Sequence, residues 1–199
     1  MIQQCKLSDL AEIRSGYTFR EKVEEVDEGD VYLIQPKDFR FTKEIKGQDY
    51  LEISDLPMIF WEGRSTAFIQ DECVLMPARG EYREALYISA SELARNTPVV
   101  AGSQFFIIYP KREVSAQYLC WVIGQPQCQN YLSQTGEGSA LRTLKISSLN
   151  EMPIPVPSEK VRSQILELHR CWLEERKLTR KLLENREKMV KGIYQNLLK

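Results

Sequence analysis

The chain of 199 residues is long enough for one ordinary domain and one additional element, and its 43% hydrophobic residues suffice for a sizeable core. Its 27 basic and 28 acidic residues give a formal net charge of −1, which argues against a protein that binds nucleic acid through a strong overall positive field. The sequence shows neither an apolar membrane span of roughly 18 residues nor a secretory signal, so we expect a cytoplasmic protein.

The cysteines predict neither a disulfide framework nor a metal site. Cys5, Cys73, Cys120, Cys128 and Cys171 are odd in number, and no two of them have C-x-x-C spacing. Cys120, Cys128 and Cys171 fall in stretches with helical periodicity. We expect these three to pack as small apolar groups.

The first two thirds of the chain predict a sheet-rich α+β domain with many short strands. Residues 6–13 predict a short opening helix or a strand–turn unit that ends at Ser15-Gly16. Further strands are expected where β-branched and aromatic residues gather between turns, at 31–34, 50–53, 68–69, 73–76, 86–89 and 98–109. Inside the last of these, Ala101-Gly102-Ser103 predicts a bulge or a close approach of two backbones.

From Ser115 onward the apolar residues recur at helical spacing. A small polar loop at 136–139 interrupts the pattern, and Pro153, Pro155 and Pro157 forbid a helix where they stand. We therefore place a boundary after Pro157. Residues 1–157 are expected to form the α+β domain, and residues 158–199 one long helix, for which Ser158 is the predicted N-cap.

The long helix is predicted to associate with a second helix. Apolar residues follow one another at alternating steps of four and three, with Glu175, Thr179 and Arg186 in the same register. Roughly 40 residues at about 1.5 Å each give a rod of about 60 Å, which one small domain cannot cover. We predict a dimer interface formed by Ile165, Leu168, Trp172, Leu182, Met189 and Ile193.

Charge is distributed unevenly between the two parts. Residues 159–199 contain 11 Lys or Arg and 6 Asp or Glu, so the other 16 basic and 22 acidic residues of the chain precede them. The predicted domain is therefore acidic overall. A contact of this domain with DNA must come from a local cluster of basic residues.

Four segments of the chain follow one another in an order that is typical of one protein family. An opening Lys6-Leu-Ser-Asp-Leu-Ala-Glu-Ile-Arg-Ser-Gly16 is followed by an apolar strand that ends in Arg79-Gly80. A helix, a polar loop and a Pro-x-Pro bridge occupy 118–157, and the long helix follows. In this order the segments resemble a target-recognition domain and its conserved helix in the DNA specificity (S) subunits of type I restriction-modification systems. Ser8 stands where glycine is common in the family.

The resemblance implies a non-catalytic subunit that reads a half-site of double-stranded DNA for partner methyltransferase subunits, often with a restriction subunit as well. The usual S subunit carries two recognition domains and two helices, whereas we find no internal repeat here, so the resemblance implies a half-length form. Such a form implies pairing through the helix, either with itself as an antiparallel homodimer or with another S chain. The helix pair would set the spacing between two half-sites.

Candidate DNA contacts are basic, amide, hydroxyl and aromatic residues on predicted loops, because such groups bind base edges and phosphates. Arg79-Gly80 permits a close backbone approach, and Ser139, Arg142 and Lys145 gather at one loop. For each candidate the alternative is a solvated charge or a partner of a nearby acid, and for Arg79 a buried ion pair. The candidates are Arg14, Tyr17, Arg20, Gln35, Lys37, Arg40, Arg79, Tyr82, Arg83, Ser139, Arg142 and Lys145.

Two other functions remain open at this point. Asp38 with Glu44 and Lys46 loosely matches the metal site of restriction nucleases, in which carboxylates hold Mg²⁺. A coiled-coil scaffold that displays the α+β domain to another protein also fits the acidic charge. A methyltransferase is disfavoured because neither its base-flipping motif nor a glycine-rich nucleotide loop is present, so we expect no cofactor.

Overall fold

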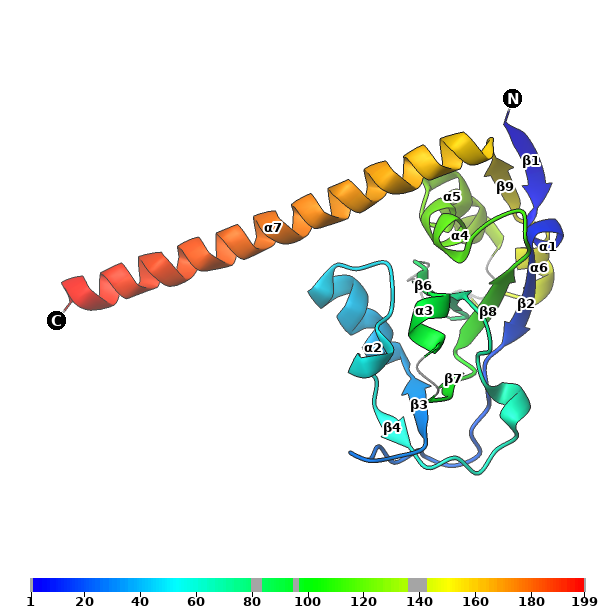
Figure 1. Ribbon diagram of the computed structural model, residues 1–199, viewed down its shortest axis with the longest axis horizontal. Coiled ribbons are helices and arrows are strands. Elements are labelled where there is room, and N and C mark those ends of the chain that lie inside the picture. The colour runs from blue at the N-terminus through cyan, green and yellow to red at the C-terminus, as the bar shows by residue number, and fades with distance from the viewer. Residues whose placement is uncertain (1, 80–83, 95–96, 136–142, 199) are drawn as a thin grey trace. The chain divides into compact units, whose positions relative to one another are not determined.

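The computed structural model describes residues 2–79, 84–94, 97–135 and 143–198 (Figure 1). Its backbone divides into two compact units, Met1–Ser158 and Glu159–Lys199. Unit 1 combines β-sheets with short helices, and unit 2 is a single long helix. The predicted α+β class with a long C-terminal helix is confirmed.

The largest sheet of unit 1 is antiparallel and has the strand order β2 (Ala11–Ser15), β8 (Phe105–Pro110), β5 (Cys73–Pro77) and β6 (Leu86–Ile88). Strand β5 is an unbroken apolar run, and Cys73 to Met76 are completely buried. Such a run is typical of a strand that is covered on both faces. The helix α4 (Ala116–Ile123) lies against β5, β6 and β8.

A second sheet has the order β4 (Met58–Ile59), β3 (Val31–Ile34) and β7 (Val99–Ala101), with β3 antiparallel to β4 and parallel to β7. The prediction of one strand over 98–109 is wrong, because β7 and β8 belong to different sheets. A tight turn separates them, in which the amide of Phe105 donates to the carbonyl of Gly102 at 3.1 Å.

The main core lies between these two sheets. Ile34, Val99 and Ala101 of the smaller sheet pack with alternate residues of the larger one, such as Leu75 and Ile107. A smaller cluster covers the other face of the smaller sheet, where buried Val31, Leu33, Ile59 and Val100 meet aromatic side chains. The main cluster fixes the two sheets relative to each other within unit 1.

The helix α2 (Pro36–Arg40) continues directly as the π-helical turn η1 (Phe41–Lys46). Asp38 accepts a hydrogen bond from the amide of Gln35 at 2.9 Å and so caps the first turn, and Pro36 occupies a position that needs no N–H donor. Gly47 ends η1 with φ of 66°. The expectation of a loop here is wrong.

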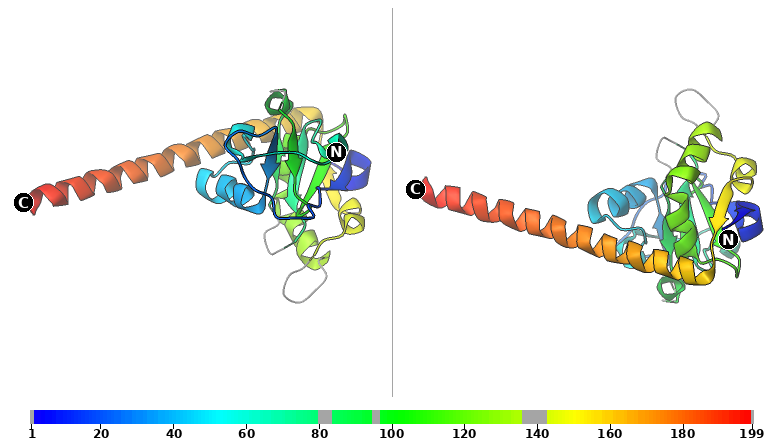
Figure 2. Two further views of the ribbon diagram at one scale, coloured as in Figure 1. Left: turned by 90° about the horizontal axis from the view of Figure 1, so that it is seen from below. Right: turned by 90° about the horizontal axis from the view of Figure 1, so that it is seen from above.

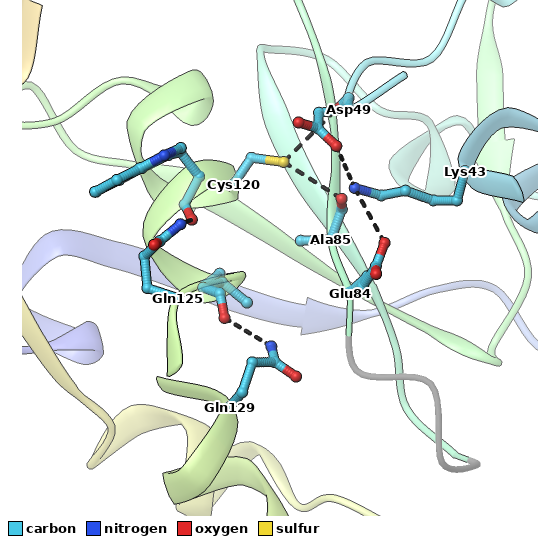
Figure 3. Close-up of polar contacts among 9 residues, drawn as sticks. Lys43, Asp49, Glu84, Ala85, Cys120, Gln125 and Gln129 are labelled. Carbon is cyan, nitrogen blue, oxygen red and sulfur yellow. Dashed lines mark hydrogen bonds and ion pairs between the residues drawn. The ribbon is translucent and has the colours of Figure 1, made fainter. Parts of the chain in front are cut away.

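A buried ion pair fixes η1 to the larger sheet (Figure 3). Lys43, whose side chain is only 9% exposed, lies 2.6 Å from Asp49 and 3.5 Å from Glu84. Burial favours the neutral amine, but the two carboxylates outweigh it and hold the pKa of Lys43 above its ordinary value. Beside them the Cys120 thiol of α4 approaches the carbonyls of Asp49 and Ala85.

The N-terminal and C-terminal ends of unit 1 are joined by a short antiparallel pair, β1 (Gln3–Lys6) with β9 (Pro153–Val156). Helix α1 (Leu7–Leu10) links β1 to β2 and contacts α6 (Ile146–Asn150), as Figures 1 and 2 show. The predicted opening unit is therefore a strand–helix–strand. The prolines of β9 are tolerated because the pair has only two strands.

Two predicted strands are absent from the described structure. Residues 50–53 make a single bridge through Tyr50 and then turn into the 3₁₀ helix η2 (Ile53–Asp55). Residues 68–69 follow the 3₁₀ turn η3 (Ser65–Ala67), and only the amide of Ile69 reaches the sheet, at the carbonyl of Val99. Both segments place apolar side chains in the main core, Leu51 and Ile53 in one and Ile69 in the other, without joining a ladder.

The predicted change to helical periodicity near Ser115 is confirmed by α4 and α5 (Pro126–Thr135). The hydroxyl of Ser115 accepts a hydrogen bond from the amide of Tyr118 at 3.2 Å and so caps α4. Another short helix, α3 (Ala90–Leu93), is capped by Ser89 in the same way. These caps show why the helices begin where they do.

Unit 2 is the helix α7 (Glu159–Leu197), and none of its described residues is buried. Its apolar stripe includes Leu168, Trp172 and Met189, which are 73%, 49% and 59% exposed. An amphipathic helix in water is stabilised chiefly by packing of its apolar face. Among the described residues, no helix combines the length and the apolarity needed to cross a bilayer.

The thiols give a direct test of the fold. Burial raises the pKa of Cys120 to about 12, that of Cys128 to about 11, and that of Cys73 above its ordinary value. Cys171 is exposed on α7, so the prediction that it packs as a core group is wrong. With a chromogenic disulfide reagent at pH 8, we expect Cys171 to react in the native protein and the three buried thiols only after urea unfolding. Cys171→Ser is the control and should show one reactive thiol fewer in the native state, since Cys5 is partly exposed, and native reaction of Cys120 would contradict the fold.

Candidate nucleic-acid interface

Several strands of unit 1 end at one place, around the turn between β7 and β8. Gly16 follows β2 and donates its amide to Phe105 at 2.9 Å, and Tyr17 donates to Ala101 at 2.7 Å. Gly102 donates to Ile34 at the end of β3 at 3.2 Å. We call the residues gathered here the strand-end surface, and they are 15–17, 35–37, 78–79, 102–104 and 143–145.

Two backbones approach closely at this surface, as the sequence at 101–103 predicts. A Cβ atom on Gly16 would lie 2.2 Å from the carbonyl oxygen of Gly102 and 2.5 Å from that of Ala101. No side chain fits between rigid backbones at such distances. Gly16 is therefore required for the crossing that brings the end of β2 onto the turn.

The same turn brings together two segments that are far apart in the sequence. The amide of Ala78 donates to Gln104 at 2.7 Å, and the amide of Leu144 donates to Ala78 at 3.0 Å. Arg79 forms a β-bridge with Thr143. Two candidate DNA contacts, Arg79 and Lys145, thus stand on adjoining segments, and both are exposed.

A pocket of about 720 Å³ opens beside the turn. Amide and hydroxyl side chains from Gln35, Ser103 and Gln104 line it, together with charged residues of the 21–25 segment. Gln35 donates from its side-chain nitrogen to Glu25 at 2.8 Å. The remaining lining residues are Phe19, Glu21, Lys22, Val23, Glu24, Leu33, Pro36 and Gly102.

The electrostatics of this region are mixed. Lys37 forms an ion pair and hydrogen bond with Glu25, and this bond lowers the pKa of Glu25 below its ordinary value. The side chains of Lys37 and Glu25 are 56% and 38% exposed, so their attraction is screened and weak.

Arg14 lies on β2, not on the predicted loop, and its guanidinium is used inside unit 1. It donates to the carbonyls of Thr66 and Phe68 at 3.0 and 2.7 Å and to the hydroxyl of Tyr109 at 2.6 Å. Burial is the main cause that raises the pKa of Tyr109 to about 12. Arg14 therefore joins the 65–68 turn to the larger sheet.

The other predicted contacts are scattered. Tyr17 packs against Phe19 and Trp61 with ring centroids 5.0 and 4.9 Å away. Arg20 and Arg40 are exposed, and Arg40 lies on α2 instead of a loop, as does Lys37. Four candidates lie outside the described residues: Tyr82, Arg83, Ser139 and Arg142.

Sequence reasoning missed Ser103, Gln104 and Lys22 at this site. Gly102 is the signal that points to the first two, because a glycine between short strands indicates a turn whose neighbouring side chains are presented to solvent. Ser103 and Gln104 are exposed at that turn. Lys22 carries no local signal that separates it from other surface lysines.

Two of the three residues of the nuclease hypothesis, Asp38 and Lys46, have structural partners. Asp38 caps α2, and burial is the main cause that raises its pKa. Lys46 pairs with Glu52 at 2.8 Å and with Asp55. Within the described ranges, no group of three His, Cys, Asp or Glu residues is placed to hold a metal ion.

Comparison with known proteins finds a specificity subunit that is similar in sequence. No family model matches the chain. The chain is 28% identical over 169 residues to the type I restriction enzyme MjaIX specificity subunit of Methanocaldococcus jannaschii, an alignment that covers 80% of this chain and 35% of that protein.

Solved structures show the same fold. The HsdS subunit from Thermoanaerobacter tengcongensis matches with a TM-score of 0.59 at 12% identity, over 89% of this chain and 38% of the other. The type I S subunit from M. genitalium gives 0.57 at 13% identity, over 94% and 43%. A chain from a type I restriction-modification complex gives 0.64 at 14% identity, over 95% and 43%.

The predicted resemblance to type I specificity subunits is thereby confirmed in sequence and in fold. The chain spans less than half the length of the proteins it matches.

Substitution of Arg14 separates a structural role from a DNA contact. We expect Arg14→Ala to lower the free energy of unfolding by about 2 kcal/mol, because two carbonyls and the Tyr109 hydroxyl lose a charged donor. The exposed Arg20→Ala is the matched control and should stay within about 0.5 kcal/mol of wild type. Urea unfolding followed by tryptophan fluorescence measures both, and equal stability of the two variants would exclude the structural role.

Proposed function

We propose that the chain is a non-catalytic DNA-recognition subunit of a type I restriction-modification complex. Unit 1 reads one half-site of double-stranded DNA and directs partner methyltransferase subunits, and in a complete system a restriction subunit, to that site. The observation that carries the proposal is the similarity to type I specificity subunits over most of the chain. Assembly with other subunits is taken from the relatives and is part of the proposal.

The strand-end surface is the proposed reading surface. Glutamine amides match the donor and acceptor pattern of adenine, and Gln35 and Gln104 both border the pocket there. Arg79 and Lys145 supply positive charge on the adjoining segments, where guanine edges and phosphates are bound. Phosphate contacts fix the register of the domain on DNA, and the amides then discriminate between bases.

The geometry supports this location better than other faces of unit 1. The sites of folds with mixed sheets commonly lie where strands end and loops begin, because loops vary while the sheets hold them in place. Here the ends of β2, β3, β5 and β7 meet at one turn.

Unit 2 is proposed as the spacing element. Its exposed apolar stripe needs another long helix, which a second copy of the chain or another S chain can supply. Paired helices hold two recognition domains at a fixed separation, so the target consists of two half-sites with an unread spacer. With two identical chains the half-sites form an inverted repeat.

Genome-wide adenine methylation tests the proposed function. In cells that carry the methyltransferase, deletion of this chain should abolish methylation at one split motif while other motifs persist, and re-expression should restore it. A palindromic motif indicates two identical chains, and an asymmetric motif indicates a second S chain. An unchanged methylome with the chain expressed would contradict the proposal and favour the scaffold alternative.

Arg79 tests the reading surface. Arg79 is exposed and makes no ion pair with the described residues, so Arg79→Ala should leave stability within about 0.5 kcal/mol of wild type. In complex with the methyltransferase, this variant should bind DNA about 10-fold to 100-fold more weakly if Arg79 reads a base. If Arg79 contacts a phosphate, the slope of log affinity against log salt should fall by about one.

Arg112→Ala is the matched control, because Arg112 is also exposed but follows β8 at the opposite end of that strand from the β7–β8 turn. Unchanged affinity and salt slope in Arg79→Ala, or an equal loss in Arg112→Ala, would place the reading surface elsewhere.

A further inference from the structure

Two charged residues, Glu175 and Arg186, interrupt the apolar stripe of α7, and neither has an oppositely charged neighbour on its own helix. Residues three and four positions away are neighbours on a helix surface, where opposite charges normally pair. Around Glu175 and Arg186 all such positions are uncharged. They are Cys171, Trp172, Leu178 and Thr179 around Glu175, and Leu182, Leu183, Met189 and Val190 around Arg186.

Glu175 and Arg186 also cannot pair with each other in one helix. Eleven positions separate them, which is about 16 Å along the axis. Within the described residues, neither side chain forms an ion pair with any other part of the chain. Both are exposed. Once another helix covers the apolar stripe, these two opposite charges lose water and need partners on that helix.

We infer that a second copy of this chain pairs with α7 in an antiparallel orientation, in one register set by an ion pair between Glu175 and the partner's Arg186. The two-fold axis repeats this pair as Arg186 with the partner's Glu175. The inference deepens the proposed pairing of the helices and rests on that part of the proposed function.

The same register pairs most of the apolar seam residues, while Ile165 faces the partner's polar Asn196. Antiparallel coiled coils place the two kinds of seam position opposite each other, layer by layer. Leu168 then faces the partner's Ile193, and Trp172 faces the partner's Met189. At the centre Thr179 faces the partner's Leu182. Each of these layers joins side chains that are exposed or half-exposed on the single chain.

Other arrangements of the two helices bring like charges together or leave a charge without a partner. A parallel pair in register places Glu175 opposite the partner's Glu175, and Arg186 opposite the partner's Arg186, which is repulsive. A shift of the antiparallel pair by one heptad puts Arg186 opposite an apolar residue, either the partner's Leu168 or the partner's Leu182. Such a shift buries a guanidinium without a carboxylate, which is unfavourable.

The occupant is a second copy because both members of the ion pair are present on this one sequence, which makes the stripe self-complementary. Polar seam residues typically lower the stability of a coiled coil but select its orientation and register. Here register has a direct consequence. A shift of one heptad moves the two recognition domains by about 10 Å, or about three base pairs of DNA.

Charge reversal tests the register in the full-length chain. Glu175→Arg places two arginines in each central layer, and Arg186→Glu places two glutamates there, so each should weaken the dimer about tenfold or more. The double variant Glu175→Arg/Arg186→Glu restores opposite charges in both layers and should return the dimer dissociation constant to within about threefold of wild type. Sedimentation equilibrium over a range of protein concentrations measures these constants.

Glu174→Arg is the matched control, because it makes the same charge change one position outside the seam and should change the constant less than about twofold. A double variant no tighter than the weaker single variant would overturn the register. A wild-type chain that stays monomeric would overturn the second copy as partner. If a monomeric chain still directs methylation to a split motif, the proposed function stands and the dimer does not. If the double variant restores the dimer but no methylation depends on the chain, the proposed function is refuted and the register stands.

Discussion

The close crossing of the backbone at Gly16 over the turn at Gly102 is the constraint on which unit 1 depends. A Cβ atom at Gly16 would meet the carbonyl of Gly102 at 2.2 Å, so the crossing exists only without a side chain. It anchors β2 to the turn between β7 and β8, and that turn receives β3 through Ile34 and the segment after β5 through Ala78. Five separate segments thus present their side chains at one surface because two backbones can touch.

The internal ion pairs of unit 1 explain part of its acidic charge. Asp49 and Glu84 neutralise the buried Lys43, while Glu52 and Asp55 pair with Lys46, so four of the acids serve to fix η1. Part of the net negative charge of unit 1 therefore belongs to acids that pair with lysines inside the unit. Under the proposed function, a domain of this kind reaches DNA through a few placed cations and amides, which favours specific over non-specific binding because long-range attraction to phosphates stays small.

Much of the fold follows from local signals, and the failures have a common cause. The strands at Val31–Ile34 and Cys73–Pro77 and the helix α4 were predictable from apolar runs and helical period. The split of residues 98–109 was not, because Gly102 signals a bulge and a turn equally, and only its contact with distant Gly16 decides between them. Likewise the sequence identifies Arg79 as a candidate DNA contact, but its place on a segment that adjoins that of Lys145 depends on the bridge between Arg79 and Thr143.

In unit 2, by contrast, the sequence alone decides how the helix can pair, because the order of the side chains along α7 determines which of them share a face. A continuous helix from Glu159 to Leu197 fixes which residues share a face, so the sequence spacing becomes a spacing in space. An unbroken apolar stripe would pair in several registers of similar energy. Two opposite charges, placed on either side of Thr179 without partners on their own helix, remove that degeneracy for an antiparallel pair of identical chains. Under the proposed pairing, stability is exchanged for a defined distance between two domains, which is the quantity that a reader of two half-sites needs.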